Sequence, residues 1–248
     1  MRAARAAVNA AGSIQELQGA RTKARTRKAR SQAIRIKIIS MGDAGVGKSC
    51  LIKRYCEEKF VQKYIGTIGV DYGVKAIKLA GIHVRVNLWD LAGGEEYFEV
   101  RNEFYKDAQG CILCYDVNSR ATFNSLNGWI DESMRYGAKN AVVIVAATKT
   151  EAGRRAVTEQ EGRAWAEANG FLYFETSAES GARVKPLFAA IFQRVLTTLP
   201  HTPPEVLEEA AQLVQTEYAA SAAAGHDCKI KVDRGLRRMS SGVSAKGY

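Results

Sequence analysis

The residues best suited to chemistry in this chain form the run Gly42-Asp43-Ala44-Gly45-Val46-Gly47-Lys48-Ser49. They fit the phosphate-binding pattern G-x-x-x-x-G-K-[ST], with an apolar stretch before them and a helix-like stretch after them. The glycines allow backbone N–H groups to turn toward phosphate oxygens, and the start of the following helix adds positive potential. Lys48 is expected to reach the β- and γ-phosphates, and the Ser49 hydroxyl is expected to bind Mg²⁺. The motif predicts a nucleoside triphosphate with magnesium and leaves the base open.

An alternation of strand-like and helix-like stretches must position this loop. Strands are expected at 34–40, 70–79, 83–90, 111–115, 141–147 and 171–174, and helices at 48–58, 122–137, 159–169 and 183–198. Ala80-Gly81, between the second and third strands, is typical of a hairpin turn. The pattern predicts an α/β, three-layer P-loop fold. Its six-stranded sheet is mostly parallel with one antiparallel strand, and helices cover both faces.

Charge divides the chain into three parts. Residues 1–33 hold eight Lys and Arg against one acid, residues 34–200 hold 22 against 19, and residues 201–248 hold six of each. We therefore expect a basic disordered extension over 1–33, one folded domain over 34–199 and a tail over 200–248. Within the tail, the capping-box pattern Thr202–Glu205 predicts one helix over about 204–224.

The basic extension leaves three interpretations open. It lacks the apolar core of a secretory signal, yet it is rich in Arg and nearly free of acids. It is a solvated disordered tail, a patch for an anionic surface or for nuclear localisation, or an organelle transit peptide. The longest apolar run, Ala141–Ala147, is far shorter than a membrane span. We expect a soluble intracellular protein, in the cytoplasm, the nucleus or both.

The five cysteines indicate a reducing compartment. Their number is odd and their spacing uneven, unlike a disulfide framework. Cys111 and Cys114 frame an apolar stretch, and residues three apart in a strand point to opposite faces. The two thiols are therefore predicted to be buried and structural, rather than a metal or redox pair.

Several further segments resemble the Ras superfamily of GTPases, and its Rab branch in particular. Phe60–Tyr72 resembles the first switch of a Rab, and Asp90-Leu91-Ala92-Gly93-Gly94-Glu95 resembles the second. The resemblance covers residues 34–199, which it implies are a small GTPase domain. Longer stretches resemble the Rbj/RJL group of Rab-like GTPases, namely 35–37, 40–42, 48–50, 53–57, 71–74, 99–107 and 170–178.

Some members of the Rbj/RJL group carry a C-terminal J domain. The closest approach to its His-Pro-Asp signature in this chain is His226-Asp227, without the proline. We expect no J-domain function from these residues.

The resemblance implies a Rab-like molecular switch that binds Mg-GTP and Mg-GDP. Phe60 is implied to pack against guanine, Thr67 to sense the γ-phosphate, and the Gly93 N–H to contact it. Residues implied to act in hydrolysis are Lys48, Thr67, Gly93 and Gly94, and those implied to hold Mg²⁺ are Ser49, Thr67 and Asp90. The implied nucleotide-binding residues are Gly42, Asp43, Ala44, Gly45, Val46, Gly47, Lys48, Ser49, Cys50, Phe60, Tyr64, Thr67, Gly93, Thr148, Lys149, Glu151, Ser177, Ala178 and Glu179.

Three residues depart from the family pattern at the nucleotide. Gly94 stands where the family usually has a Gln that orients the attacking water, so hydrolysis is expected to be slow or dependent on a partner. Glu95 or Glu96 could in principle substitute for the missing Gln, but neither occupies the familiar position, and a solvated acid at a helix start is the favoured role for both. Glu151 stands where an Asp usually accepts from guanine, and Glu179 where a Lys is common. A misplaced charged hydrogen bond costs about 1.5–3 kcal/mol, so guanine affinity is expected to fall tenfold or more.

The implied partners are effector, exchange and activating proteins, which bind around residues 60–72 and 90–105. We expect a monomer without a stable lipid anchor, because no prenylation cysteine ends the sequence and no Gly follows Met1. The basic residues 1–33 predict only weak contact with anionic surfaces.

Three alternatives stay open beside the switch. One is a scaffold or adaptor that holds GTP permanently and does not hydrolyse it. Another is a P-loop nucleotide kinase or ATPase, although no insertion is long enough for a lid. The last is a basic nucleic-acid-binding protein, which the nearly balanced charge of residues 34–200 disfavours.

Overall fold

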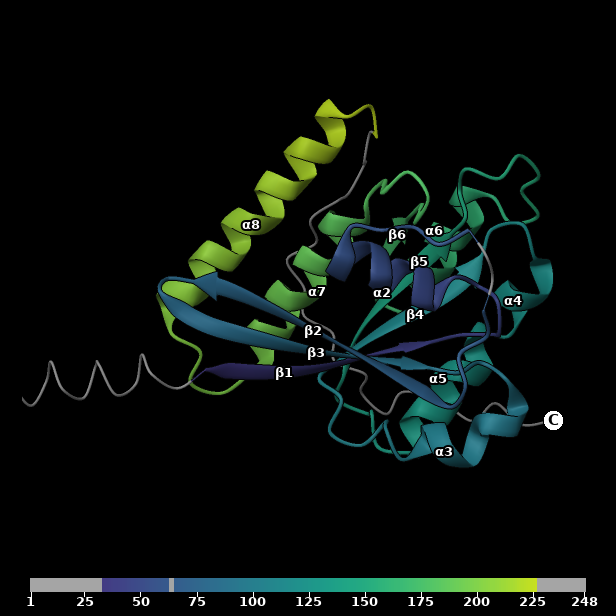
Figure 1. Ribbon diagram of the computed structural model, residues 1–248, viewed down its shortest axis with the longest axis horizontal. Coiled ribbons are helices and arrows are strands. Elements are labelled where there is room, and N and C mark those ends of the chain that lie inside the picture. The colour runs from purple at the N-terminus through teal and green to yellow at the C-terminus, as the bar shows by residue number, and fades with distance from the viewer. Residues whose placement is uncertain (1–32, 63–64, 227–248) are drawn as a thin grey trace, which may run out of the picture.

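A computed structural model describes residues 33–62 and 65–226 of the chain. Six strands form one sheet in the order β2-β3-β1-β4-β5-β6 (Figure 1). They are β1 (Ile34–Met41), β2 (Val70–Leu79), β3 (Ile82–Leu91), β4 (Gly110–Asp116), β5 (Val142–Thr148) and β6 (Leu172–Glu175). β2 pairs antiparallel with β3, and every other pair is parallel. The predicted fold class is confirmed.

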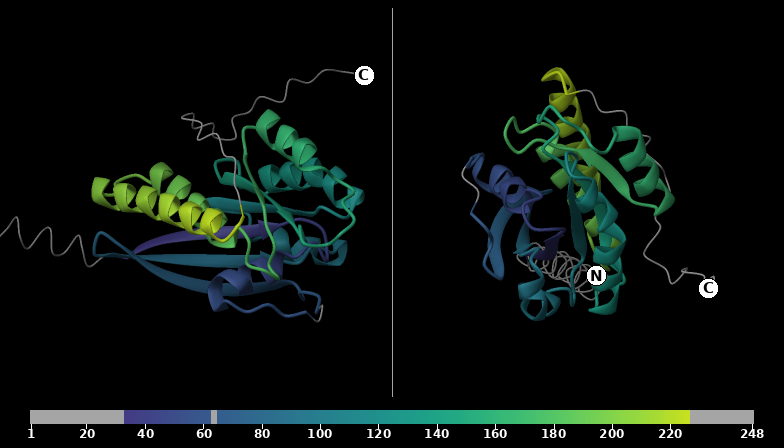
Figure 2. Two further views of the ribbon diagram at one scale, coloured as in Figure 1. Left: turned by 90° about the horizontal axis from the view of Figure 1, so that it is seen from above. Right: turned by 90° about the vertical axis from the view of Figure 1, so that its right-hand side faces the viewer.

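The sheet separates two apolar cores. Along β1, Ile38 belongs to one core and Ile39 to the other, because successive side chains of a strand point to opposite faces. The helices that bound the cores are α2 (Lys48–Glu57), α3 (Phe98–Asn102), α4 (Arg120–Asn124), α5 (Leu126–Arg135), α6 (Glu159–Ala168), α7 (Val184–Thr198) and α8 (Pro204–Ala223). α2, α7 and α8 pack on one face, and α4, α5 and α6 on the other (Figure 2).

Two local expectations at the sheet agree with the structure. The β2–β3 turn has Ala80 at φ 49° and Gly81 at φ 78°, the paired left-handed conformation of a two-residue hairpin. Cys111 and Cys114 are fully buried in opposite cores. Burial raises the pKa of each thiol to about 12, so both are structural in character.

The structure corrects three expectations about the helices. The helix expected over 122–137 is two helices, because Ser125 interrupts it and turns its hydroxyl to the Asp43 carboxylate, 2.7 Å away. A 3-10 turn, η1 (Glu95–Tyr97), and α3 lie outside the four helix ranges expected from periodicity, since single turns show none, although they agree with the helix start expected at Glu95 and Glu96. The capping box is also wrong: the N-cap residue of α8 is Pro203, whose side chain has no oxygen to accept a hydrogen bond.

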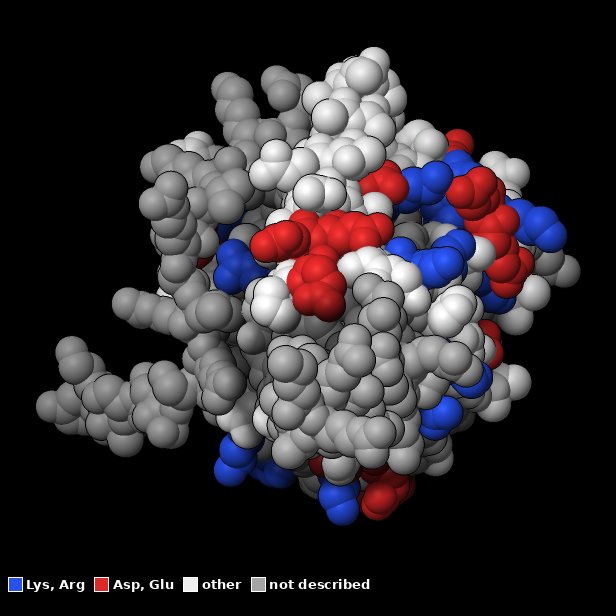
Figure 3. All heavy atoms as spheres, turned by 90° about the vertical axis from the view of Figure 1, so that its left-hand side faces the viewer, with Lys and Arg blue, Asp and Glu red and all other residues white. Residues whose placement is uncertain are grey.

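Helix α8 lies along α7 and reaches the end of the β2–β3 hairpin (Figure 1). Val206 and Ala210 of α8 are buried, and Glu209 of the same helix accepts a hydrogen bond from the Ala80 N–H. Acidic side chains gather near the middle of the face at this end of the molecule (Figure 3). The first turns of α8 carry Glu205, Glu208 and Glu209. The extension 1–32 and the tail from residue 227 lie outside the described residues.

Candidate functional site

The loop Gly42–Ser49 connects β1 to α2 at the carboxyl edge of the parallel strands. Gly47 precedes α2 with φ 99°, which glycine adopts without strain. Gly42 has φ 136°, and a Cβ there would collide with the carbonyl of Cys114. Both positions require glycine. Helix α2 therefore begins at Lys48 with its positive end directed into the loop.

Lys48 lies inside the loop and is 5% exposed. Its ammonium donates to the carbonyl oxygens of Gly42 at 2.7 Å and Asp43 at 2.8 Å. Burial lowers the pKa of Lys48 below its ordinary value, and nearby Asp90 opposes this effect. An ammonium held by neutral carbonyls keeps its charge available to an anion.

The loop is fastened on both sides. The Asp43 carboxylate accepts from Ser125 Oγ at 2.7 Å and from Trp129 Nε1 at 2.6 Å, which ties the loop to α5. On the other side, the Thr148 hydroxyl at the end of β5 lies 2.5 Å from the Val46 carbonyl oxygen. These contacts fix the loop to α5 on one side and to the end of β5 on the other.

Three oxygen-bearing side chains from separate elements meet beside the loop. Ser49 Oγ lies 2.8 Å from Thr67 Oγ1, and Thr67 Oγ1 lies 3.2 Å from Asp90 Oδ2. Ser49 also donates to Asp90 Oδ2, and Asp90 is 3% exposed. In an octahedral Mg²⁺ site, with bonds of about 2.0–2.1 Å, neighbouring oxygens are about 2.9 Å apart. The three oxygens therefore fit one side of a magnesium site.

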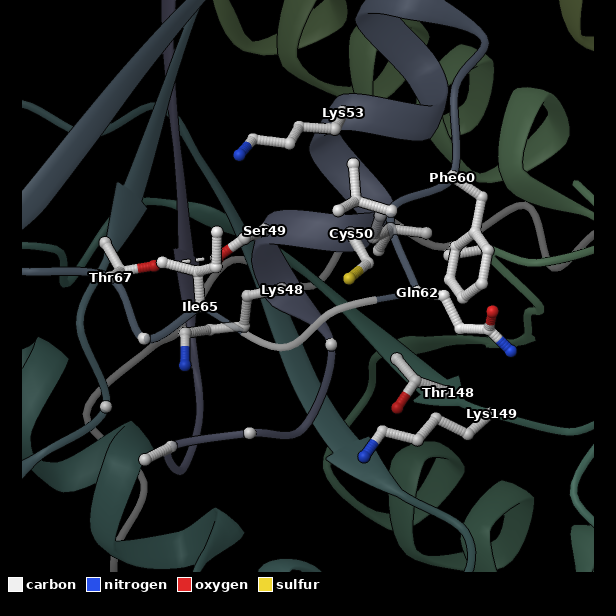
Figure 4. Close-up of a pocket in the computed structure, with 18 of the residues that line it drawn as sticks. Lys48, Ser49, Cys50, Lys53, Phe60, Gln62, Ile65, Thr67, Thr148 and Lys149 are labelled. Atoms are coloured by element: carbon white, nitrogen blue, oxygen red, sulfur yellow. Dashed lines mark hydrogen bonds between the residues drawn. The ribbon is translucent and has the colours of Figure 1, made fainter.

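A cavity of about 590 Å³ opens over the loop and both flanking segments. Figure 4 shows Lys48, Ser49 and Thr67 in one part of it and Thr148 and Lys149 in another. It is lined by these predicted residues: Ala44, Gly45, Gly47, Lys48, Ser49, Cys50, Phe60, Thr67, Gly93, Gly94, Thr148, Lys149, Glu151, Ala178 and Glu179. Its volume suits a nucleotide.

The part of the cavity expected to hold the base lies between Phe60 and the loop after β5 (Figure 4). The Lys149 ammonium is fixed there by Asp116 Oδ2 at 2.8 Å. Glu151 and Glu179 line the same cavity and are exposed. Their carboxylates are therefore free to adjust to a ligand at little cost in strain.

The second switch approaches the phosphate loop closely. A Cβ on Gly93 would collide with the backbone of Asp43 and Ala44, so only glycine fits there. Arg101 Nη1 donates to the Gly94 carbonyl oxygen at 2.5 Å, and Arg101 pairs with the Glu132 carboxylate at 2.7 and 2.9 Å. Tyr105 Oη donates to the same carboxylate at 2.7 Å. The switch backbone is thereby joined to α5.

Not every predicted residue faces the cavity. Gly42, Asp43, Val46, Asp90 and Ser177 do not line it. Val46 is buried in the core, and Asp90 reaches the site only through Ser49 and Thr67. Tyr64 lies outside the described residues.

Sequence reasoning missed several lining residues. They include Lys53, Gln62, Ile65, Tyr97 and Thr176. Glu96, considered above as a substitute for the missing Gln, is exposed and lines the cavity as well. Lys53 shares a helix with Ser49 at a spacing of four, so helical periodicity was the signal available for it. The others occupy loops and single turns, where no periodic signal exists.

Two negative findings concern only the described part of the chain. No helix in it is long and apolar enough to cross a membrane. Nor does that part gather three or more His, Cys, Asp or Glu side chains for a metal ion. The Ser49–Thr67–Asp90 set is a mixed hydroxyl and carboxylate group, which suits Mg²⁺ rather than a transition metal.

Comparison with known proteins agrees with this arrangement. The model of the Ras family matches residues 37–197. The chain is 49% identical over 181 residues to DnaJ homolog subfamily C member 27-A of Xenopus laevis, covering 71% of this chain and 66% of that protein. It is 46% identical over 180 residues to DnaJ homolog subfamily C member 27 of Danio rerio, covering 70% and 66%.

The corresponding human protein is 47% identical over 172 residues, covering 67% of this chain and 63% of that protein. The aligned part thus spans just under two thirds of these relatives. With a family match over residues 37–197 and the phosphate loop at its start, the chain belongs to the Ras family of small GTPases.

Proposed function

We propose that this protein is a Rab-like molecular switch that binds Mg-GTP and Mg-GDP and presents its two switch segments to effectors. The observation that carries the proposal is the meeting of Ser49, Thr67 and Asp90. Thr67 comes from a loop without regular structure, and this cluster ties its side chain to the phosphate loop. A switch needs such a contact, because the loop is then held or released according to the ligand.

Each part of the cavity has a task in this function. Lys48 and the backbone N–H groups of Gly45 and Gly47 bind the phosphates, and the N-terminus of α2 adds positive potential. Ser49, Thr67 and Asp90 would hold Mg²⁺, which neutralises phosphate charge when bound. Phe60 and Lys149 would pack on the two faces of the base, and Glu151 would accept from guanine.

The surface around the cavity supports binding of a protein partner. Ile65 is 72% exposed, Ile68 is 83% exposed and Val100 is 48% exposed. Ile65 and Ile68 line the cavity, and Val100 lies on α3 in the second switch. Exposed apolar side chains in both switches form a patch whose shape depends on the nucleotide. Effector, exchange and activating proteins are the partners that such a patch would bind.

The nucleotide that accompanies the purified protein tests the proposal. After denaturation, chromatography should find close to one guanine nucleotide per chain and little adenine nucleotide. Addition of EDTA should release the nucleotide, because the Mg²⁺ that Ser49, Thr67 and Asp90 would hold neutralises phosphate charge when bound. A chain that carries adenine nucleotide, or that binds no nucleotide after reconstitution with Mg-GTP, would contradict the proposal.

The same sample separates the switch from a permanently loaded scaffold. A switch converts bound GTP to GDP over time, whereas a scaffold retains GTP. A variant Lys48→Ala serves as the negative control, because it removes the ammonium that the phosphate loop encloses.

A further inference from the structure

The space that a side chain would fill at residue 94 is occupied by another residue of the second switch. Gly94 has φ −72° and ψ 147°, a conformation that any residue adopts. The backbone therefore does not demand glycine at this position. What occupies the space of a side chain is the carboxylate of Glu96: a Cβ at residue 94 would lie 2.5 Å from Glu96 Oε1. Glycine here admits the Glu96 carboxylate.

The Glu96 side chain faces the cavity that the predicted phosphate-binding and magnesium-binding residues also line. Glu96 lines the cavity together with Lys48, Thr67 and Gly93, whereas its neighbour Glu95 does not. Among residues 33–62 and 65–226, no side chain or backbone group forms a hydrogen bond or ion pair with the Glu96 carboxylate. Both of its oxygens are therefore available to a water molecule.

The turn that carries Glu96 is firmly placed. The Gly94 carbonyl oxygen accepts from Arg101 Nη1 at 2.5 Å and from the Tyr97 N–H at 3.2 Å. The second of these bonds closes the 3-10 turn η1, which has Glu96 at its centre. Arg101 is 4% exposed and pairs with Glu132 on α5. The backbone that carries Glu96 is thereby held, which limits the reorganisation needed to bring its carboxylate to a bound substrate.

We propose that Glu96 is a catalytic residue of GTP hydrolysis, with its carboxylate orienting the attacking water that a side chain at residue 94 would otherwise orient. This inference rests on the function proposed above and names the residue that performs its hydrolytic step. The water-orienting group is then at residue 96 instead of residue 94, and it has not been lost.

The step balances as an in-line displacement. The water oxygen forms a bond to the γ-phosphorus while the bond from that phosphorus to the β–γ bridging oxygen breaks. The electron pair of the broken bond stays on the β-phosphate of GDP, and inorganic phosphate departs. The water loses one proton, which the Glu96 carboxylate accepts and returns to solvent.

The added negative charge near a triphosphate does not argue against this role. Glu96 is exposed, so solvent screens its repulsion toward the phosphates. The Lys48 ammonium is buried in the loop beside the phosphate positions, where its attraction is screened less. The cavity thus binds the anion through Lys48 and exposes one carboxylate to the water.

Single-turnover hydrolysis of preloaded GTP by the full chain tests the proposal. Glu96→Ala should slow hydrolysis by about 10²-fold or more, the range of a positioned general base. Glu95→Ala is the matched control, because it removes a neighbouring exposed acid that does not line the cavity, and it should leave the rate within about twofold. Dissociation of a fluorescent GTP analogue should change by less than about threefold in both variants.

Two further variants separate catalysis from structure. Gly94→Ala adds one methyl group that the backbone tolerates but that displaces the Glu96 carboxylate, so it should slow hydrolysis about tenfold or more. Gly94→Gln combined with Glu96→Ala should be faster than Glu96→Ala alone, because a Gln at residue 94 restores a water-orienting group.

The outcomes distinguish the two proposals. If the chain binds GTP and Glu96→Ala hydrolyses it at the parental rate, Glu96 is not catalytic and the switch stands. Glu96 is equally excluded as a catalytic residue if the parent binds GTP without measurable hydrolysis. If the chain binds no GTP, the proposed function itself fails and Glu96 loses its substrate.

Discussion

Removal of the Arg101 guanidinium is the perturbation whose consequences the structure specifies most fully. Arg101 donates twice to Glu132, at 2.7 and 2.9 Å, and once to the Gly94 carbonyl oxygen at 2.5 Å. Its guanidinium carbon also lies 4.6 Å from the centre of the Trp129 ring. The pair is largely withdrawn from water, with side chains 5% and 16% exposed. One residue thus joins the second switch to α5.

The expected loss of unfolding free energy follows from the state of Glu132 once Arg101→Ala has removed its partner. Breaking a buried ion pair by removing one partner costs about 3–5 kcal/mol of unfolding free energy. Glu132 keeps the Tyr105 hydroxyl at 2.7 Å and is 16% exposed, so the cost lies near about 3 kcal/mol. Urea unfolding with saturating Mg-GDP measures it, and the matched control is Arg135→Ala at the solvent-facing end of α5.

A double variant separates stability from positioning. Arg101→Leu with Glu132→Leu replaces the ion pair by apolar side chains, which often restores the stability lost by breaking such a pair. It does not restore the donor to the Gly94 carbonyl. We therefore expect stability close to the parent, together with faster hydrogen exchange at residues 94–97 and slower hydrolysis. A loss below about 1 kcal/mol in Arg101→Ala, or unchanged exchange in the double variant, would refute this reasoning.

Four other predictions use different parts of the molecule. Thr67→Ala should weaken GTP binding about tenfold with little effect on GDP, because one hydrogen-bonding ligand of the triphosphate state is lost; equal losses for both nucleotides in a displacement assay would contradict it. Glu151→Asp should raise guanine affinity about tenfold by shortening the carboxylate to its familiar length, as measured with a fluorescent GDP analogue, and a fall in affinity would oppose this view. Val206→Asp places a charge in the buried contact of α8 and should cost more than about 3 kcal/mol in urea unfolding, whereas a change under about 1 kcal/mol would argue against that contact. Cys111 and Cys114, whose buried thiols have a pKa of about 12, should resist a thiol reagent at pH 8 until the protein unfolds, and rapid labelling of the native chain would count against their burial.

The fold was accessible from the sequence because its signals are local and repeated. Apolar runs and amphipathic stretches alternate along residues 34–199, and Ala80-Gly81 marks the hairpin. The phosphate loop was accessible because its glycines and Lys48 stand at fixed spacing. Asp90 and Thr148 stand at the ends of predicted strands. They lie near the loop because parallel strands end at one edge of the sheet.

The remaining features depend on contacts that no local pattern encodes. Glu96 reaches the cavity because of the single turn η1 and the missing side chain at Gly94. The Arg101–Glu132 pair joins residues 31 positions apart across two elements. Ser125 lies between α4 and α5 and donates a hydrogen bond to Asp43, 82 positions earlier. Such contacts follow from the packed structure, which hydrophobic periodicity specifies only in outline.

Nucleotide competition in the presence and absence of Mg²⁺ tests whether the protein is a guanine-nucleotide switch. The full chain is loaded with a fluorescent GTP analogue and challenged with GTP, GDP, ATP and XTP. We expect GTP and GDP to displace the probe at far lower concentrations than ATP, and chelation of Mg²⁺ to speed release of the probe. Displacement by ATP as effective as that by GTP, or release that ignores Mg²⁺, would contradict a guanine-nucleotide switch built on Lys48, Ser49 and Thr67.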